Sequence, residues 1–308
     1  MQKVTVLYVA GTGRSGSTLL GNMLGQVAGF FSGGEMNNLF KRGVTENWFC
    51  GCGVRFDSCP VWTEVLARAY GPSGTDPQAM VRCLNRLTRV RQIPSLLRRK
   101  GDPAGLGAGA PECLAELDRL YRALGESTGA RVIVDSSKSP SYGFLLGMLP
   151  SVDLRVVHLV RDPRGTAFSW RRKVMRSDGA AERPMQRMSL PKSSALWSIW
   201  NLTAEAMWRR SGAPYMRLRY EDLMAGPAEA VKTVLDLAGV APEDLDFIGD
   251  GCVTLDPHHT ISGNPMRLRT GEVELKPDLE WATAMPFAQR LIVTVLTAHS
   301  LRRYGYPI

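Results

Sequence analysis

Apolar positions near the start of the chain form two successive patterns. Val4 to Ala10 is a nearly continuous apolar run rich in β-branched side chains, which is typical of a strand buried on both faces. After a glycine-rich segment, Thr18 to Ala28 carries leucine, methionine and valine at helical spacing. The pattern therefore predicts a strand, a glycine turn and a helix in that order.

The same unit recurs further along the chain. Short apolar runs predict three more strands, at Arg131 to Asp135, Leu154 to Val160 and Tyr215 to Tyr220, and a helical pattern then runs from Pro227 to Ala238. Strands alternating with helices favour an α/β fold: a central parallel sheet of the phosphate-loop type with helices on both faces. Ligands of such sheets bind beyond the carboxyl ends of the strands, where this sequence carries polar clusters.

The pattern breaks between Trp48 and Ala130. Gly71 to Gly74 and Gly101 to Pro111 are rich in small residues and proline, which indicates connectors rather than regular elements. We interpret 48–130 as a helical insert within a single domain that spans 1–308.

Length and composition are those of an ordinary globular protein. The 308 residues are 44% apolar and 22% charged, with a formal charge of +9, which excludes disordered and collagen-like chains. The longest apolar runs fall short of the ~20 residues that span a bilayer. We also expect no signal peptide, because the first ten residues contain one lysine and a single short apolar run. With six cysteines and no need for disulfides, we expect a cytoplasmic protein with reduced thiols. The positive charge suits nucleic acid, anionic lipid or a small anion, and alone does not choose among them.

The segment GTGRSGST, from Gly11 to Thr18, has the spacing of a phosphate-binding loop, except that Ser17 stands where lysine is required. Glycines let backbone N–H groups face an anion, and the following helix adds its positive N-terminus. The missing lysine argues against a nucleoside triphosphatase, because that lysine reaches the β- and γ-phosphates. Arg14 could supply the charge through a bidentate contact with phosphate or sulfate oxygens. The alternative is a turn that binds nothing.

Four separated segments together resemble the sulfotransferase family that uses 3′-phosphoadenosine 5′-phosphosulfate. In the family's order they are Arg14 to Leu19 (RSGSTL), Arg161 to Arg164 (RDPR) with Ser169, Tyr220 to Leu223 (YEDL), and Gly263 to Arg267 (GNPMR) ahead of Trp281. The chain is similar to bacterial-type enzymes and to tyrosylprotein and carbohydrate sulfotransferases. The resemblance implies transfer of the sulfuryl group from this donor to an acceptor hydroxyl by in-line displacement, without a metal ion.

The resemblance also implies which residues bind the donor. The loop would hold the 5′-phosphosulfate, the second segment and a late basic loop the 3′-phosphate, and a tyrosine the nucleotide. These residues are Arg14, Ser15, Gly16, Ser17, Thr18, Arg161, Ser169, Tyr220, Arg267 and Arg269. The alternatives are a local ion pair of Arg161 with Asp162 and a packing corner at Tyr220.

Three catalytic residues follow from the same resemblance. Glu35 matches the general base of the tyrosylprotein enzymes, and would accept the hydroxyl proton as a carboxylate whose pKa is raised by burial. Lys138 would stabilise charge on the bridging oxygen, and Arg14 the sulfuryl group. Many relatives use histidine as the base, so His258 and His259 in the late loop remain rivals. Glu35 could instead form only a salt bridge or a helix cap, and Lys138 could be a solvated loop residue.

Cys50, Cys52 and Cys59 form a C-x-C-x6-C cluster. Three thiolates could bind zinc with a fourth ligand from elsewhere, although the spacing is not C-x2-C and no histidine is near in sequence. A redox-sensitive pair and plain buried thiols are also open.

Two further function classes compete with sulfuryl transfer. A phosphoryl-transfer enzyme would need Mg²⁺ and a lysine at the position of Ser17. A polyanion binder would use the arginines between Arg82 and Lys100, but this stretch lacks the aromatic residues that stack bases, so we expect no nucleic-acid partner. We expect a small-molecule, natural-product or glycan acceptor, with 48–130 and Met175 to Ser194 as pocket walls. The oligomeric state is open, and a homodimer is compatible with the sequence.

Overall fold

A five-stranded sheet forms the centre of the computed structural model, which describes residues 3–98, 103–176, 182–209, 211–241 and 244–308. All neighbouring strands are parallel, in the order β2-β3-β1-β4-β7. These strands are β1 (Val4–Gly11), β2 (Phe30–Gly34), β3 (Val132–Lys138), β4 (Val152–Val160) and β7 (Tyr215–Arg219). Two antiparallel pairs lie outside the sheet: β5 (Met175–Arg176) with β6 (Arg183–Pro184), and β8 (Cys252–Leu255) with β9 (Gly271–Glu274).

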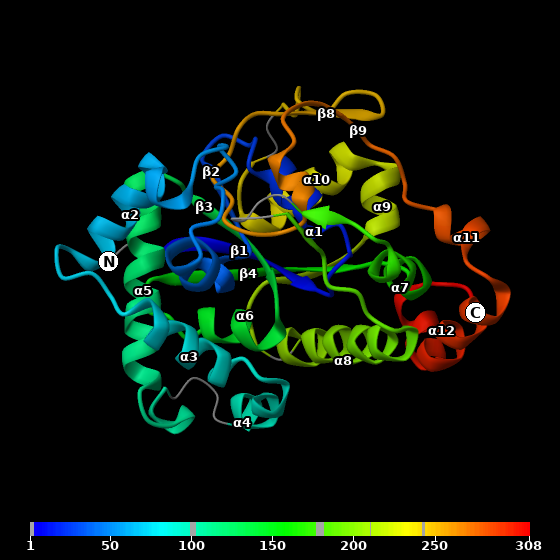
Figure 1. Ribbon diagram of the computed structural model, residues 1–308, viewed down its shortest axis with the longest axis horizontal. Coiled ribbons are helices and arrows are strands. Elements are labelled where there is room, and N and C mark those ends of the chain that lie inside the picture. The colour runs from blue at the N-terminus through cyan, green and yellow to red at the C-terminus, as the bar shows by residue number, and fades with distance from the viewer. Residues whose placement is uncertain (1–2, 99–102, 177–181, 210, 242–243) are drawn as a thin grey trace.

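Helices cover both faces of this sheet (Figure 1). One face carries α5 (Ala110–Thr128), α6 (Pro140–Leu146) and α8 (Leu190–Trp208); the other carries α1 (Ser17–Leu24), α9 (Tyr220–Ala225) and α10 (Pro227–Ala238). Alternate side chains of the central strand β1 pack on opposite faces of the sheet. Tyr8 packs on the face that carries α5, α6 and α8, and Leu7 and Val9 pack on the face that carries α1, α9 and α10. This alternation follows from the two-residue repeat of a strand. The predicted α/β class is confirmed.

The remaining α-helices of the described residues are α2 (Pro60–Tyr70), α3 (Pro77–Leu87), α4 (Ile93–Arg98), α7 (Pro163–Arg171), α11 (Glu280–Ala284) and α12 (Phe287–Leu301). The segment 48–130 contains α2 to α5. Its last helix packs directly on the sheet, because Leu117 and Tyr121 share one apolar cluster with Ile133 of β3. Within the described part of the chain, no helix combines the length and apolar character that a membrane crossing needs.

Four strands agree with the sequence pattern to within three residues at each end. The strand β2 was missed, because its sequence FFSGG ends in two glycines and lacks an apolar period; pairing with β3 holds it extended. Helix α1 ends at Leu24 instead of continuing to Ala28, since the chain turns at Gly25. Arg99 and Lys100 of the arginine-rich stretch, and 177–181 of the expected pocket wall, lie outside the described residues.

Candidate active site

Predicted site residues follow the carboxyl ends of all five strands of the sheet. Glu35 follows β2, Lys138 ends β3, Arg14 lies after β1, Arg161 after β4 and Tyr220 after β7. Their order along this edge is the order of the strands, and at ~4.8 Å between neighbouring strands the row spans roughly 19 Å. The sheet therefore brings residues far apart in sequence to the edge where parallel sheets bind ligands.

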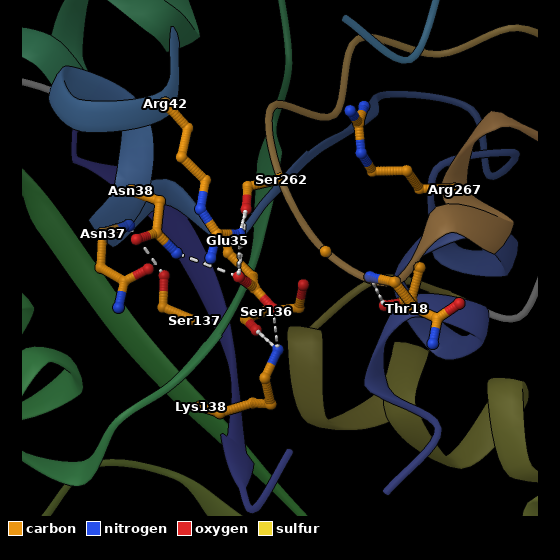
Figure 2. A network of polar contacts seen from close by, with 12 residues as sticks. Thr18, Glu35, Asn37, Asn38, Arg42, Ser136, Ser137, Lys138, Ser262 and Arg267 are labelled. Carbon is orange, nitrogen blue, oxygen red and sulfur yellow. Dashed lines mark hydrogen bonds and ion pairs between the residues drawn. The ribbon is translucent and has the colours of Figure 1, made fainter. Parts of the chain in front are cut away.

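Glu35 and Lys138 form an ion pair at one end of this row (Figure 2). Lys138 Nζ lies 2.7 Å from Glu35 Oε1 and donates a hydrogen bond to the carbonyl of Ser136 at 2.8 Å. Pairing of β2 with β3 brings the two side chains together, because Gly34 lies opposite Asp135. Only 16% of the Glu35 side chain and 11% of the Lys138 side chain are exposed. The two predicted catalytic groups thus share one nearly buried polar site.

The second carboxylate oxygen of Glu35 is held by three further side chains. It accepts hydrogen bonds from Asn38 Nδ2 at 3.0 Å and Ser262 Oγ at 3.1 Å, and lies 3.4 Å from Arg42 Nη1. The Glu35 amide also donates to the Ser262 carbonyl at 3.0 Å. No local sequence signal points to these residues: Ser262 is 227 positions from Glu35, and Arg42 lies in a π-helical turn, Leu39–Thr45, without a motif of its own.

The surrounding charges set the pKa of Glu35. Burial alone would raise it, but the charges of Lys138 and Arg42, with hydrogen bonds from Lys138 and Ser262, lower it to about 2. The expectation of a pKa raised by burial is therefore wrong, because two cations outweigh the loss of water. Glu35 is ionised at neutral pH.

These contacts are expected to make the stability of the fold depend on pH. The pKa of Glu35 in the folded chain lies below its ordinary value of 4.5, so its stabilisation is complete above that value and is lost as the pH falls toward 2. At neutral pH the contribution is at most about 3 kcal/mol. In urea unfolding, Glu35→Gln should therefore lower the free energy of unfolding by more at about pH 7 than at about pH 3. An equal loss at both pH values would contradict the lowered pKa.

Two of the predicted cationic residues have an unusual backbone. The φ angles of Arg14 and Lys138 are 72° and 69°, in the left-handed region that residues other than glycine rarely adopt. Among the residues that the structure describes, Asn47 is the one other non-glycine residue with positive φ. Such strain persists where the surrounding structure maintains it, and it concentrates at functional sites. This supports placing Arg14 and Lys138 in the site.

The glycine-rich loop packs against two aromatic side chains. A Cβ atom at Gly13 would lie 2.7 Å from the Trp170 ring, and one at Gly16 would lie 2.7 Å from the Tyr220 ring. Both positions therefore require glycine. Arg14 lies over Trp170 with its guanidinium carbon 4.8 Å from the ring centroid. Helices α7 and α9 thus fix the loop from the side of β4 and β7.

Arg161 connects this loop to the late part of the chain. Its guanidinium lies over the Tyr220 ring at 4.5 Å, donates to the Arg14 carbonyl at 3.2 Å and pairs with Asp278 at 3.0 Å. The sequence alternative was a local ion pair of Arg161 with Asp162. In the structure, Asp162 instead caps α7 and pairs with Arg164. A phosphate at this end of the row would compete with Asp278 for Arg161.

The remaining predicted donor-binding residues differ in exposure. Ser169 lies half-buried on α7, and Arg269 is exposed. Arg267 (Figure 2) is fully buried and donates to the carbonyls of Thr260 at 2.9 Å and Phe49 at 2.7 Å. The assignment of Arg267 and Arg269 to the 3′-phosphate stays a prediction, and the contacts of Arg267 favour a role in holding the late loop.

The two histidines considered as rival bases face other groups. His259 Nδ1 lies 3.3 Å from Cys59 Sγ. His258 Nδ1 lies 3.1 Å from Thr260 Oγ1, and burial together with the charge of Arg267 lowers the pKa of His258 to about 4. These contacts favour Glu35 as the proton acceptor.

Asp135, a buried residue of β3, supports the site. Its carboxylate accepts hydrogen bonds from the Ser137 amide at 2.9 Å and from the hydroxyl of Tyr121, and burial raises its pKa to about 6. Ser137 Oγ in turn accepts from the Asn37 amide at 3.0 Å. Asp135 therefore links the end of β3 to the segment after Glu35, as a positioning residue.

Known proteins with similar sequences are sulfotransferases. Residues 7–244 match the sulfotransferase family. Over 174 residues the chain is 27% identical to carbohydrate sulfotransferase 3 of Homo sapiens and 25% identical to that of Mus musculus. Each alignment covers 52% of this chain and 35% of the relative, so the chain spans about a third of the length of these curated relatives.

Two solved structures share the fold. The sulfotransferase domain of the Synechococcus PCC 7002 olefin synthase has a TM-score of 0.55 at 21% identity, with 100% of this chain and 96% of that chain covered. The sulfotransferase domain from the curacin biosynthetic pathway has a TM-score of 0.53 at 17% identity, with 100% of both chains covered. At these identities the likeness shows a common fold.

Proposed function

The chain belongs to the sulfotransferase family, and on this premise we propose that it transfers the sulfuryl group of 3′-phosphoadenosine 5′-phosphosulfate to an acceptor hydroxyl. The observation that carries the proposal is the row of residues along the strand ends. A nearly buried carboxylate lies beside an ammonium group at one end, and arginines lie toward the other. This arrangement suits a long anionic donor whose reacting group is at one end.

Donor binding would divide between the loop and α7. N–H groups of Arg14 to Thr18 and the positive N-terminus of α1 would bind the 5′-phosphosulfate. Arg14 would form bidentate hydrogen bonds to sulfuryl or phosphate oxygens. Arg161 and Ser169 would bind the 3′-phosphate. Tyr220 would contact the nucleotide. A lysine at the position of Ser17 is unnecessary, because this donor has no γ-phosphate.

The transfer would be a single in-line displacement. The acceptor oxygen forms a bond to sulfur while the bond from sulfur to the bridging phosphate oxygen breaks. Glu35 takes the hydroxyl proton, and Lys138 stabilises the negative charge that develops on the leaving phosphate. Lys138 would have to turn from Glu35 toward the bridging oxygen, which raises the pKa of Glu35 when a base is needed.

We propose a small-molecule, natural-product or glycan acceptor. The likeness to carbohydrate sulfotransferase 3 supports a sugar hydroxyl as one such acceptor. In this proposal the reacting centre uses no metal ion, because Arg14 and Lys138 neutralise the transferred and leaving groups. We also propose that the protein is located in the cytoplasm.

Nucleotide binding tests the identity of the donor. We expect calorimetry to show 3′,5′-adenosine bisphosphate binding at least about tenfold more tightly than 5′-AMP, since hydrogen bonds to a charged group contribute roughly 1.5–3 kcal/mol. Arg161→Ala should remove this preference and leave the affinity for 5′-AMP nearly unchanged. Ser169→Ala should weaken the preference without removing a charge.

Arg119→Ala is the matched control, because Arg119 is an exposed arginine paired with Glu116, and it should keep the full preference. The donor assignment fails if the wild-type chain binds the bisphosphate no better than 5′-AMP. Transfer of labelled sulfate from the donor to a library of hydroxyl compounds then tests the acceptor class.

A further inference from the structure

Cys50, Cys52, Cys59 and His259 form a compact cluster in which the four ligand atoms lie within 4.8 Å of one another. The Sγ atoms of Cys52 and Cys59 are 3.8 Å apart. His259 Nδ1 lies 3.3 Å from Cys59 Sγ and 3.8 Å from Cys50 Sγ. The sequence left the fourth member of this cluster open, because His259 is 200 positions from Cys59 and the fold brings it there.

The three separations of 3.3–3.8 Å are close to the edges of a zinc-centred tetrahedron. Bonds of ~2.3 Å to sulfur and ~2.0 Å to nitrogen place neighbouring ligand atoms roughly 3.5–3.8 Å apart. We propose that Cys50, Cys52, Cys59 and His259 bind one zinc ion. All four positions are supplied by the protein, which is typical of a structural site; a catalytic site keeps one position for water or substrate.

The geometry favours zinc over the two remaining interpretations of the cysteines. A disulfide between Cys52 and Cys59 would not explain why Cys50 and His259 also lie in the cluster. All three cysteines are free thiols in the structure. Plain apolar packing would not require an imidazole nitrogen directed at two sulfur atoms. A four-ligand metal site accounts for every member of the cluster.

The surroundings hold His259 in the orientation that coordination needs. Its ring stacks on Phe31 with the centroids 6.4 Å apart and the planes at 3°, and its carbonyl accepts from Trp62 Nε1 at 2.8 Å. Cys50 and Cys59 are buried, and Cys52 is partly exposed. A cavity of about 390 Å³ is lined in part by Cys52 and Pro257, so this side of the cluster lies next to a hollow in the surface.

The zinc ion would tie the segment around Cys50 to the late loop. The Gly51 amide already donates to the Thr260 carbonyl at 2.9 Å. Three residues beyond His259, Ser262 contacts the Glu35 carboxylate at 3.1 Å. The ion would therefore position a loop of the active site without touching the reacting atoms. Zinc binding by these four residues does not depend on which donor or acceptor the enzyme uses.

Metal analysis of the purified 308-residue chain tests this site. We expect about one zinc per chain after dialysis against metal-free buffer. Cobalt(II) added to the metal-free, reduced chain should give the intense visible absorption of tetrahedral thiolate coordination. Cys52→Ser should lose the zinc and most of this absorption, and it is the variant least expected to disturb packing, because Cys52 is partly exposed.

Cys252→Ser is the matched control, since Cys252 is also a partly exposed free thiol but lies on β8, outside the cluster; it should bind metal like the wild type. Chelation should lower the Tm of the wild type by several degrees and leave the Tm of Cys52→Ser unchanged. The proposal is overturned by a wild-type chain that holds less than about a tenth of an equivalent of zinc and gives no cobalt absorption. A Cys52–Cys59 disulfide in protein purified without oxidant would overturn it as well.

Discussion

Replacing Glu35 by glutamine is expected to lower the rate of sulfuryl transfer by about 10²- to 10⁴-fold, the usual contribution of general acid–base catalysis. Glutamine keeps the size of the side chain and can still accept hydrogen bonds from Asn38 and Ser262, which now bind the carboxylate. It cannot accept the hydroxyl proton. The affinity for 3′,5′-adenosine bisphosphate should stay close to that of the wild type, because the arginines assigned to its phosphates lie further along the sheet edge. Single-turnover rates and calorimetry measure the two quantities separately.

Glu64→Gln provides the control for this experiment. Glu64 is an exposed carboxylate that pairs with Arg68 at 3.3 Å, so the same chemical change there should leave the rate unaltered. If Glu35→Gln folds, binds the bisphosphate and retains most of the wild-type rate, Glu35 is not the base.

The pH profile of kcat/KM distinguishes Glu35 from a histidine base. This ratio reports the free enzyme, in which the pKa of Glu35 is about 2, so Glu35 gives no loss of activity between neutral pH and about pH 5. A histidine with an ordinary pKa would produce an acidic limb near about pH 6.5. A limb at that pH which persists in Glu35→Gln would point to histidine.

The parts of the fold that sequence could predict are those with a local signal. Val4 to Ala10 is a β-branched run followed directly by glycines, so both the strand and its loop can be recognised from adjacent residues. The same holds for Leu154 to Val160 with Arg161. Because parallel strands expose their carboxyl ends at one edge, placing Arg14, Lys138 and Arg161 together required only the order of elements. The strand β2 lacks such a signal and depends on its neighbour β3.

The parts that could not be predicted depend on contacts between distant segments. The pKa of Glu35 is set by Lys138 and Arg42, and no local pattern reveals that both cations meet the same carboxylate. The fourth member of the cysteine cluster is a second case, since His259 enters it from the late loop. In both cases the residue type indicated the kind of chemistry, a carboxylate base or a thiolate metal site. The residues that set the pKa of that carboxylate and complete that metal site come from distant parts of the chain.

Replacing Lys138 by methionine is expected to lower kcat by about 10²- to 10³-fold, because the ammonium group acts on charge that develops as the bond to the bridging oxygen breaks. KM for the donor should change much less, since the interaction strengthens only in the transition state. Lys232→Met is the control: Lys232 is a partly exposed lysine that pairs with Glu229 at 3.0 Å, and its loss should have no effect on either constant.

The same variant also tests the influence of Lys138 on the proton acceptor. Lys138 is the strongest of the charges that lower the pKa of Glu35, so its removal should raise that pKa and produce an acidic limb in kcat/KM that the wild type lacks. A loss of activity that is equal at all pH values would contradict the effect of Lys138 on the pKa of Glu35. A donor KM that rises while kcat stays at the wild-type value would instead make Lys138 a residue of ground-state binding, and the stabilisation of the bridging oxygen would then have to come from Arg14.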